Sequence, residues 1–116
     1  MRTYPYFHKI ACAGKGFYFD DIPVETMEVP FLGGADFVIG VNGDSMTPDY
    51  SDGDIVYVRK VTELKQGDVG IFTIGNECFI KELGADRLIS RNRSYNDIKG
   101  NEDVRLIGKV IGKVAE

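Results

Sequence analysis

The stretch "VGIFTIGNECFIKEL", residues 69–83, decides the fold class of this chain. Two runs rich in Val, Ile and Phe flank the dipeptide Gly75-Asn76. β-Branched and aromatic residues favour strands, and two such runs separated by two turn-forming residues are typical of a tight hairpin. The stretch therefore predicts two antiparallel strands joined by a short turn.

Similar short runs occur on both sides of this hairpin, separated by turn signals such as "DGD" at 52–54 and "KQGD" at 65–68. No stretch keeps apolar residues at helical spacing over three turns, and only residues 47–51 and 62–65 are candidates for short helices. We therefore expect a mainly β fold of short antiparallel strands, formed by the hairpin and by "FVIGV" (37–41), "DIVYV" (54–58), "DRLIS" (86–90) and "VRLIGKVIGKV" (104–114).

The length of 116 residues fits one structural domain. Residues 1–35 differ from the rest, because they hold three of the four prolines and several aromatic residues but little strict alternation. We predict that residues 1–35 form an N-terminal arm over a β domain of residues 36–116, with "FLGGAD" (31–36) as the hinge.

The composition excludes several classes of protein. A net charge of −4 and a pI of about 5.0 argue against an isolated nucleic-acid-binding domain, which is usually basic. The absence of a long apolar run or a secretory signal predicts a cytoplasmic protein that does not enter a membrane. Cys12 and Cys78 are interpreted as free thiols, and the single His8 cannot complete a zinc site with them, so we expect no metal and no cofactor.

Ser45, in "VNGDSMTPDYSDGDIVYV" (41–58), is the candidate nucleophile. The pattern G-x-S-x-G fails because Thr47 stands at the second glycine position, and S-x-x-K fails because Pro48 stands at the lysine position. A Ser-His-Asp triad would need His8 on the arm. The nearby aspartates do not follow the order of an EF-hand and are interpreted as turn residues: Asp44, Asp49, Asp52 and Asp54.

Lysine is the remaining amine that could serve as the base. Its ordinary pKa of about 10.4 must fall by roughly 3 units, so the useful lysine should lie among apolar side chains. Strand alternation places Phe79, Lys81 and Leu83 on one face, which makes Lys81 the candidate. From the pattern alone, the favoured interpretation is a lysine that protects an edge strand from aggregation.

Longer segments carry a family resemblance. "ADFVIGVNGDSMTPDYSDGDIVYVRK", "GDVGIFTIGNECFIKEL", "LISRNRSYNDI" and "LIGKVIGKV" strongly resemble the C-terminal domain of LexA-like and phage cI-like repressors, the S24 family of self-cleaving Ser-Lys peptidases. The resemblance extends from about residue 4 to residue 114, and the interval of 36 residues from Ser45 to Lys81 matches the family. It implies a LexA/signal-peptidase-like, β-barrel-type fold with an N-terminal cleavage-loop arm.

The resemblance also implies a reaction. Ser45 would attack the carbonyl of Ala13 in the Ala13-Gly14 bond, and neutral Lys81 would take the serine proton and pass it to the leaving amine. Backbone N–H groups of Asp44 and Ser45 would hold the oxyanion. The carboxylate of Asp44 beside the nucleophile is a departure, because a carboxylate facing the lysine would raise its pKa and slow cleavage.

The implied function is that of a repressor domain that dimerises, and that cleaves itself when a RecA filament signals DNA damage. We expect the homodimer to form through "RLIGKVIGKV" (105–114), with a plain core strand as the alternative interpretation of these residues. Operator DNA would be bound only by a helix-turn-helix domain that is absent from this chain. A UmuD-like, self-processing accessory subunit of a translesion polymerase is the alternative. A pure interaction module also stays open, whereas a signal peptidase would need a membrane anchor.

Overall fold

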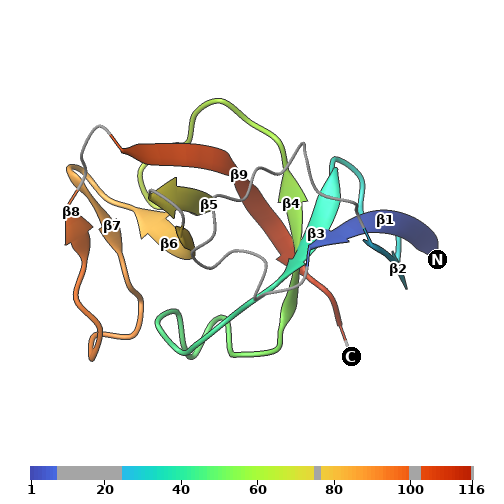
Figure 1. Ribbon diagram of the computed structural model, residues 1–116, viewed down its shortest axis with the longest axis horizontal. Coiled ribbons are helices and arrows are strands. Elements are labelled where there is room, and N and C mark those ends of the chain that lie inside the picture. The colour runs from blue at the N-terminus through green and yellow to red at the C-terminus, as the bar shows by residue number, and fades with distance from the viewer. Residues whose placement is uncertain (8–24, 75–76, 100–102, 116) are drawn as a thin grey trace.

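The computed structural model describes residues 1–7, 25–74, 77–99 and 103–115, and these residues form strands without any helix. The expected mainly β fold is therefore confirmed (Figure 1). The strands are β1 (Arg2–Phe7), β2 (Glu25–Val29), β3 (Phe37–Gly40), β4 (Ile55–Arg59), β5 (Val69–Ile74), β6 (Glu77–Leu83), β7 (Arg87–Ile89), β8 (Ile98–Lys99) and β9 (Val104–Lys113).

The prediction of short helices at 47–51 and 62–65 is wrong, since both segments are turns or irregular chain. Aspartate side chains explain the difference. Asp54 accepts a hydrogen bond from the backbone N–H of Ser51, and Asp68 accepts one from that of Lys65. Such local bonds compete with helix formation and favour turns.

The strands form one sheet in the order β2-β1-β3-β4-β9-β5-β6-β7-β8. β5 and β6 pair antiparallel from Val69↔Glu82 to Ile74↔Glu77, which confirms the pairing expected of residues 69–83; the dipeptide Gly75-Asn76 itself lies outside the described residues. The pairing between β1 and β3 is parallel, so the sheet is mixed rather than wholly antiparallel.

The N-terminal strands belong to the same sheet as the strands after residue 36. β1 pairs with β3 through Tyr6↔Val38 and Phe7↔Ile39, and β2 pairs with the other edge of β1. The right-hand side of Figure 1 shows β1 lying between these two neighbours. The division of the chain at residue 35 stays a prediction.

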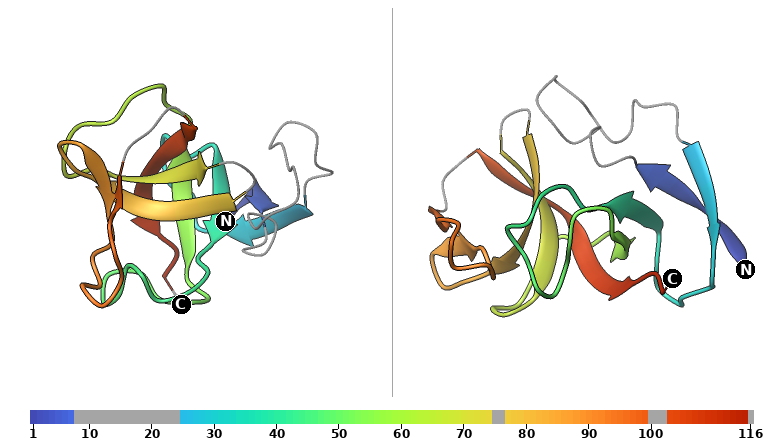
Figure 2. Two further views of the ribbon diagram at one scale, coloured as in Figure 1. Left: turned by 60° about the vertical axis from the view of Figure 1, so that its left-hand side comes forward. Right: turned by 90° about the horizontal axis from the view of Figure 1, so that it is seen from below.

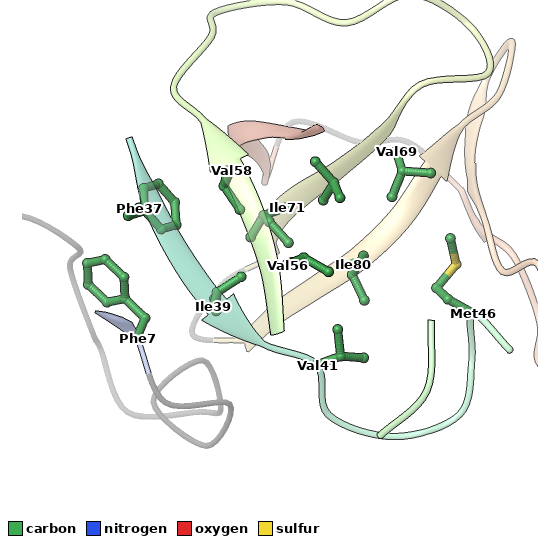
Figure 3. Close-up of a cluster of buried hydrophobic side chains, with 11 residues drawn as sticks. Phe7, Phe37, Ile39, Val41, Met46, Val56, Val58, Val69, Ile71 and Ile80 are labelled. Atoms are coloured by element: carbon green, nitrogen blue, oxygen red, sulfur yellow. The ribbon is translucent and has the colours of Figure 1, made fainter. Parts of the chain in front are cut away.

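Strand alternation buries residues on both faces of this sheet. One cluster gathers side chains of β3, β4, β5 and β6 with Met46 and Phe7 (Figure 3). The intervening residues Val38 and Tyr57 point to a second cluster that also contains Tyr4 and Val29. β3 is buried on both faces, so its position is fixed, and the loop that carries Ser45 starts from its C-terminal end.

β9 lies in the middle of the sheet, with β4 on one edge and β5 on the other. A Cβ atom at Gly108 would lie 2.6 Å from Val58 Cγ1 and 2.7 Å from the carbonyl oxygen of Arg59. The close backbone approach that glycine permits here is therefore used within the chain.

Candidate functional site

The Ser45 loop, residues 41–54, connects β3 to β4 and carries the candidate nucleophile. Gly43 and Gly53 adopt positive φ angles of 85° and 91°, which glycine tolerates without steric cost. The N–H of Gly43 donates to Asp52 Oδ1 at 2.8 Å, so the two ends of the loop are tied together. Met46, the residue after Ser45, is only 1% exposed and anchors the loop in the core (Figure 3).

Lys81 lies on β6 opposite Gly70 of β5 and is only 4% exposed. Its Nζ lies 2.7 Å from Ser45 Oγ and makes a hydrogen bond to it. The ring of Phe79 lies on the same side, with its centroid 5.8 Å from Nζ. This burial excludes the alternative interpretation of an exposed lysine protecting a strand edge.

Two opposing effects act on the pKa of Lys81. Burial lowers the pKa below its ordinary value, because an ammonium group loses hydration in the interior. The negative charge of Asp97 raises the pKa and partly opposes this effect. Burial is the larger effect, so the neutral amine is favoured more than in a solvent-exposed lysine.

The carboxylate that acts on Lys81 is not the one the sequence suggested. Asp44 is exposed and does not contribute to the pKa shift of Lys81, whereas Asp97 does. Asp97 Oδ1 accepts hydrogen bonds from Arg93 Nη1 at 2.8 Å and from the N–H of Ser90 at 3.1 Å. Arg93 is the first cause that lowers the pKa of Asp97, so this carboxylate stays ionised.

The 90–97 loop, between β7 and β8, braces the Ser45 loop. The N–H of Asn92 donates to the carbonyl oxygen of Ser45 at 2.9 Å, and Asn92 Nδ2 lies 3.0 Å from both the carbonyl oxygen of Asp44 and Thr47 Oγ1. Figures 1 and 2 show the two loops side by side. Sequence reasoning did not find Asn92, because its spacing from Ser45 matches no local motif.

Charged side chains also hold the Ser45 loop from two directions. Arg91 bridges Glu82 on β6 and Asp49, with nitrogen–oxygen distances of 2.8 and 3.0 Å. From the end of β9, Lys113 Nζ donates to the carbonyl oxygen of Asp49 at 3.0 Å and lies 3.4 Å from Asp54 Oδ2. The nucleophile is thus carried on a loop that is fixed to β6 and β9.

A cleft of about 290 Å³ opens at Ser45 and Lys81. Side chains of β3 and β5 and the N-terminal part of β6 form its walls, and the cleft is lined by Ile39, Gly40, Val41, Asn42, Gly43, Asp44, Ser45, Ile71, Glu77, Cys78, Phe79, Ile80, Lys81 and Tyr95. The cleft thus combines aliphatic walls with a half-buried serine and a buried lysine.

The proposed oxyanion donors also border this cleft. No hydrogen bond within the described residues uses the backbone N–H groups of Asp44 or Ser45. The predicted cleavage bond, Ala13-Gly14, lies outside the described residues, as do His8 and Cys12. Its position relative to Ser45 therefore stays a prediction.

The described part of the chain offers no candidate metal site and no candidate membrane span. Within residues 1–7, 25–74, 77–99 and 103–115, no group of three or more His, Cys, Asp or Glu side chains could hold a metal ion. Over the same ranges no helix is long and apolar enough to cross a membrane.

Comparison with known proteins shows to which family the chain is similar. The model of the family described as Peptidase S24-like matches residues 5–111. The LexA repressor of Thermobifida fusca is 35% identical over 80 residues, covering 65% of this chain and 31% of the relative. The LexA repressor of Carboxydothermus hydrogenoformans is 30% identical over 83 residues, covering 66% and 41%, and that of Leptospira biflexa is 36% identical over 81 residues, covering 66% and 40%.

The matches cover less than half of each of these relatives, so they concern one domain of a longer repressor. The resemblance seen in the sequence is confirmed by a family match over nearly the whole chain. This chain belongs to the Peptidase S24-like family and forms a LexA-like domain of that family.

Proposed function

We propose that this chain is the C-terminal regulatory domain of a LexA/cI-like transcriptional repressor, and that it cuts its own Ala13-Gly14 bond with Ser45 and Lys81. The observation that carries the proposal is the 2.7 Å contact between Ser45 Oγ and the buried amine of Lys81. A serine attacks a peptide only when a nearby base accepts its proton, and a buried lysine meets that need.

The reaction begins with transfer of the Ser45 hydroxyl proton to the neutral Nζ of Lys81. Ser45 Oγ then bonds to the carbonyl carbon of Ala13, and the oxyanion is held by the N–H groups of Asp44 and Ser45. As the carbon–nitrogen bond breaks, the lysine proton passes to the amine of Gly14. Water next attacks the acyl ester, with Lys81 accepting its proton. The bond between Ser45 Oγ and the acyl carbon breaks, Oγ takes the proton back from Lys81, and the Ala13 carboxylate is released.

The intramolecular substrate fits this design. Ala13 and Gly14 are small, so the backbone could approach Ser45 Oγ closely. A bond within the same chain is present at high effective concentration, so weak docking suffices. Control would then come from a shift of the cleavage loop between an undocked and a docked position. We propose that a RecA filament favours the docked position.

The repressor role extends to a dimer and to DNA. Because both edges of β9 are paired, a homodimer through residues 105–114 would use side chains of this strand rather than its backbone. Operator DNA would be bound by a helix-turn-helix domain ahead of the N-terminal arm. The relatives from Thermobifida fusca, Carboxydothermus hydrogenoformans and Leptospira biflexa are LexA repressors, which supports this role over that of a polymerase accessory subunit.

Mild alkaline incubation followed by intact mass spectrometry tests the peptidase proposal. Raising the pH deprotonates Lys81 without an activator, so the wild-type chain should yield a fragment that begins at Gly14. Ser45→Ala and Lys81→Ala should remain whole, whereas Ser51→Ala, a change at an exposed serine of the same loop, should be cut like wild type. A folded wild-type chain that keeps its full mass at pH values up to about 10, near the ordinary lysine pKa, would contradict the proposal.

A further inference from the structure

β1 is an internal strand of the sheet although it lies close to the N-terminus. Its residues Arg2 to Tyr6 pair with β2, and Tyr6 and Phe7 pair with β3. Both neighbours follow residue 24 in the sequence, so they lie on the other side of the Ala13-Gly14 bond from β1. In the right-hand view of Figure 2, β1 lies next to β2.

Two buried aromatic side chains anchor β1 on opposite faces of the sheet. Tyr4 is 2% exposed and packs edge-to-face on Tyr57, with ring centroids 5.9 Å apart. Phe7 is 6% exposed and packs edge-to-face on Phe37 at 5.1 Å. When an extended peptide joins a sheet, main-chain hydrogen bonds supply affinity and side chains in pockets supply specificity. Buried aromatic rings add a large apolar contribution to the same binding.

Polar contacts hold the same strand in register. The hydroxyl of Tyr4 donates to the carbonyl oxygen of Leu32 at 3.1 Å and accepts from the N–H of Leu32 at 3.0 Å. The guanidinium of Arg2 lies over the ring of Phe31, 5.3 Å from its centroid. These partners again follow residue 24, so cutting the chain between Ala13 and Gly14 removes none of these contacts.

We infer that the facing edges of β2 and β3, between which β1 lies, form a peptide-binding groove. Its occupant after the cut is the N-terminal product itself, held through β1. The proposed cut of the Ala13-Gly14 bond is then a separate step from release of the N-terminal product. Any segment that precedes Arg2 in the full-length protein stays attached until β1 leaves the groove. Departure of β1 is opposed because it would expose Tyr4, Phe7 and two strand edges.

The cut still changes the energetics of β1. Before the cut its binding is intramolecular, and afterwards the strand is held only by its own contacts and can exchange with free peptide. The identity of the cut bond rests on the proposed function, whereas the groove and its occupant are described independently of it. Retention can therefore be tested in a chain that cannot cut itself.

The experiment uses the full chain with Ser45→Ala and a site for a sequence-specific protease inserted between residues 13 and 14. After digestion, denaturing mass spectrometry should show two pieces, while native mass spectrometry should show one complex with the summed mass. Fluorescently labelled peptide of residues 1–13, added in excess, should enter the complex with slow exchange kinetics. Two separated pieces under native conditions would overturn the inference.

Matched variants identify the contacts that hold the strand. Phe7→Ala should speed exchange by at least about 10-fold, since it removes a buried aromatic anchor. Thr3→Ala, at an exposed position of the same strand, should exchange within about 2-fold of the parent, as expected for a surface change. Equal exchange rates in both variants would also contradict the assigned groove.

The outcomes separate this inference from the peptidase proposal. If the nicked complex stays together while the wild-type chain is never cut in alkali, self-cleavage fails and the groove stands. If the wild-type chain is cut and its fragments part at once, the peptidase proposal stands and the groove fails.

Discussion

Two segments that adjoin β3 are held by different kinds of interaction. The Ser45 loop is held by directional polar contacts from Asn92, Arg91 and Lys113. β1 is held mainly by a backbone ladder and by the buried rings of Tyr4 and Phe7. Side-chain hydrogen bonds fix the Ser45 loop within a narrow range of geometry, which a nucleophile needs. β1 combines ladder hydrogen bonds with apolar packing, which adds affinity with less demand on angles.

This difference predicts which property a substitution in each segment should change. Changes around Ser45 should alter the cleavage rate more than the stability of the domain. Changes in β1 should alter stability or retention while leaving the chemistry of Lys81 intact.

Lys81→Met should give the largest effect. Loss of the base should lower the rate of self-cleavage by at least about 10²- to 10⁴-fold, the usual contribution of general-base catalysis. Stability at neutral pH should be preserved or increased, since methionine buries no amine. Intact mass over time and urea unfolding measure the two quantities. Lys65→Met, an exposed lysine, is the control, and a rate within about 10-fold of wild type in Lys81→Met would exclude Lys81 as the base.

Asn92→Ala should lower the cleavage rate by about 10- to 100-fold, because a misplaced nucleophile loses the reactive geometry. It leaves Thr47 Oγ1 and the carbonyl oxygen of Asp44 without this donor. The pH at half-maximal rate should stay unchanged, since Lys81 is untouched. Asn96→Ala, at an exposed position of the same loop, should behave as wild type. A shifted pH profile in Asn92→Ala would indicate a role other than positioning.

Tyr4→Phe tests the other side of the comparison. It removes the two hydrogen bonds to Leu32 while keeping the ring, and should lower the free energy of unfolding by about 1–3 kcal/mol. The pH dependence of cleavage should match that of wild type. Urea unfolding and a pH series of cleavage rates check both statements, and a changed pH profile would show that the arm and the Ser45 loop are coupled.

The lowered pKa of Lys81 predicts a pH-dependent stability. Between its folded pKa and its unfolded pKa, the unfolded chain binds more protons than the folded chain, so stability rises with pH in this window. The slope contributed by this group should be at most about 1.4 kcal/mol per pH unit. Urea unfolding of Ser45→Ala should show this slope, and the double variant with Lys81→Met should lack it. Equal slopes in the two proteins would contradict a shifted Lys81.

Asp97→Asn should give the smallest effect. Removing the negative charge lowers the pKa of Lys81 further, so cleavage at neutral pH should become several-fold faster, a change of at most about 1 pH unit in the profile. The alkaline plateau should be unchanged. Asp86→Asn is the control, because Asp86 does not act on Lys81. An unshifted profile would show that Asp97 has no influence on the base.

Local pattern was enough to predict the mainly β class and the strands β3 to β7 and β9, but not β1, β2 or β8. Alternation and turn residues act over a few neighbours, so runs such as those of β5 and β6 can be recognised from the chain alone. The same pattern placed Lys81 beside Phe79 on one face of β6. The short helices failed because aspartate side chains satisfied the backbone in turns, which a count of apolar spacing does not register.

The pairing of Ser45 with Lys81 was implied by family resemblance, whereas alternation could not distinguish a buried base from a lysine at a strand edge. The resemblance also did not indicate Asn92 as a brace or Asp97 as the charge acting on Lys81. These contacts join residues far apart in the chain, and only the packing of the loops brings them together.

By itself, the sequence determined the period and boundaries of most strands, since those depend on neighbouring residues. Only the tertiary structure decided that Lys81 is buried at 2.7 Å from Ser45, and that β1 lies parallel to β3. The physical reason is that desolvation and strand order depend on which distant segments exclude water together, and no short stretch of chain contains that information.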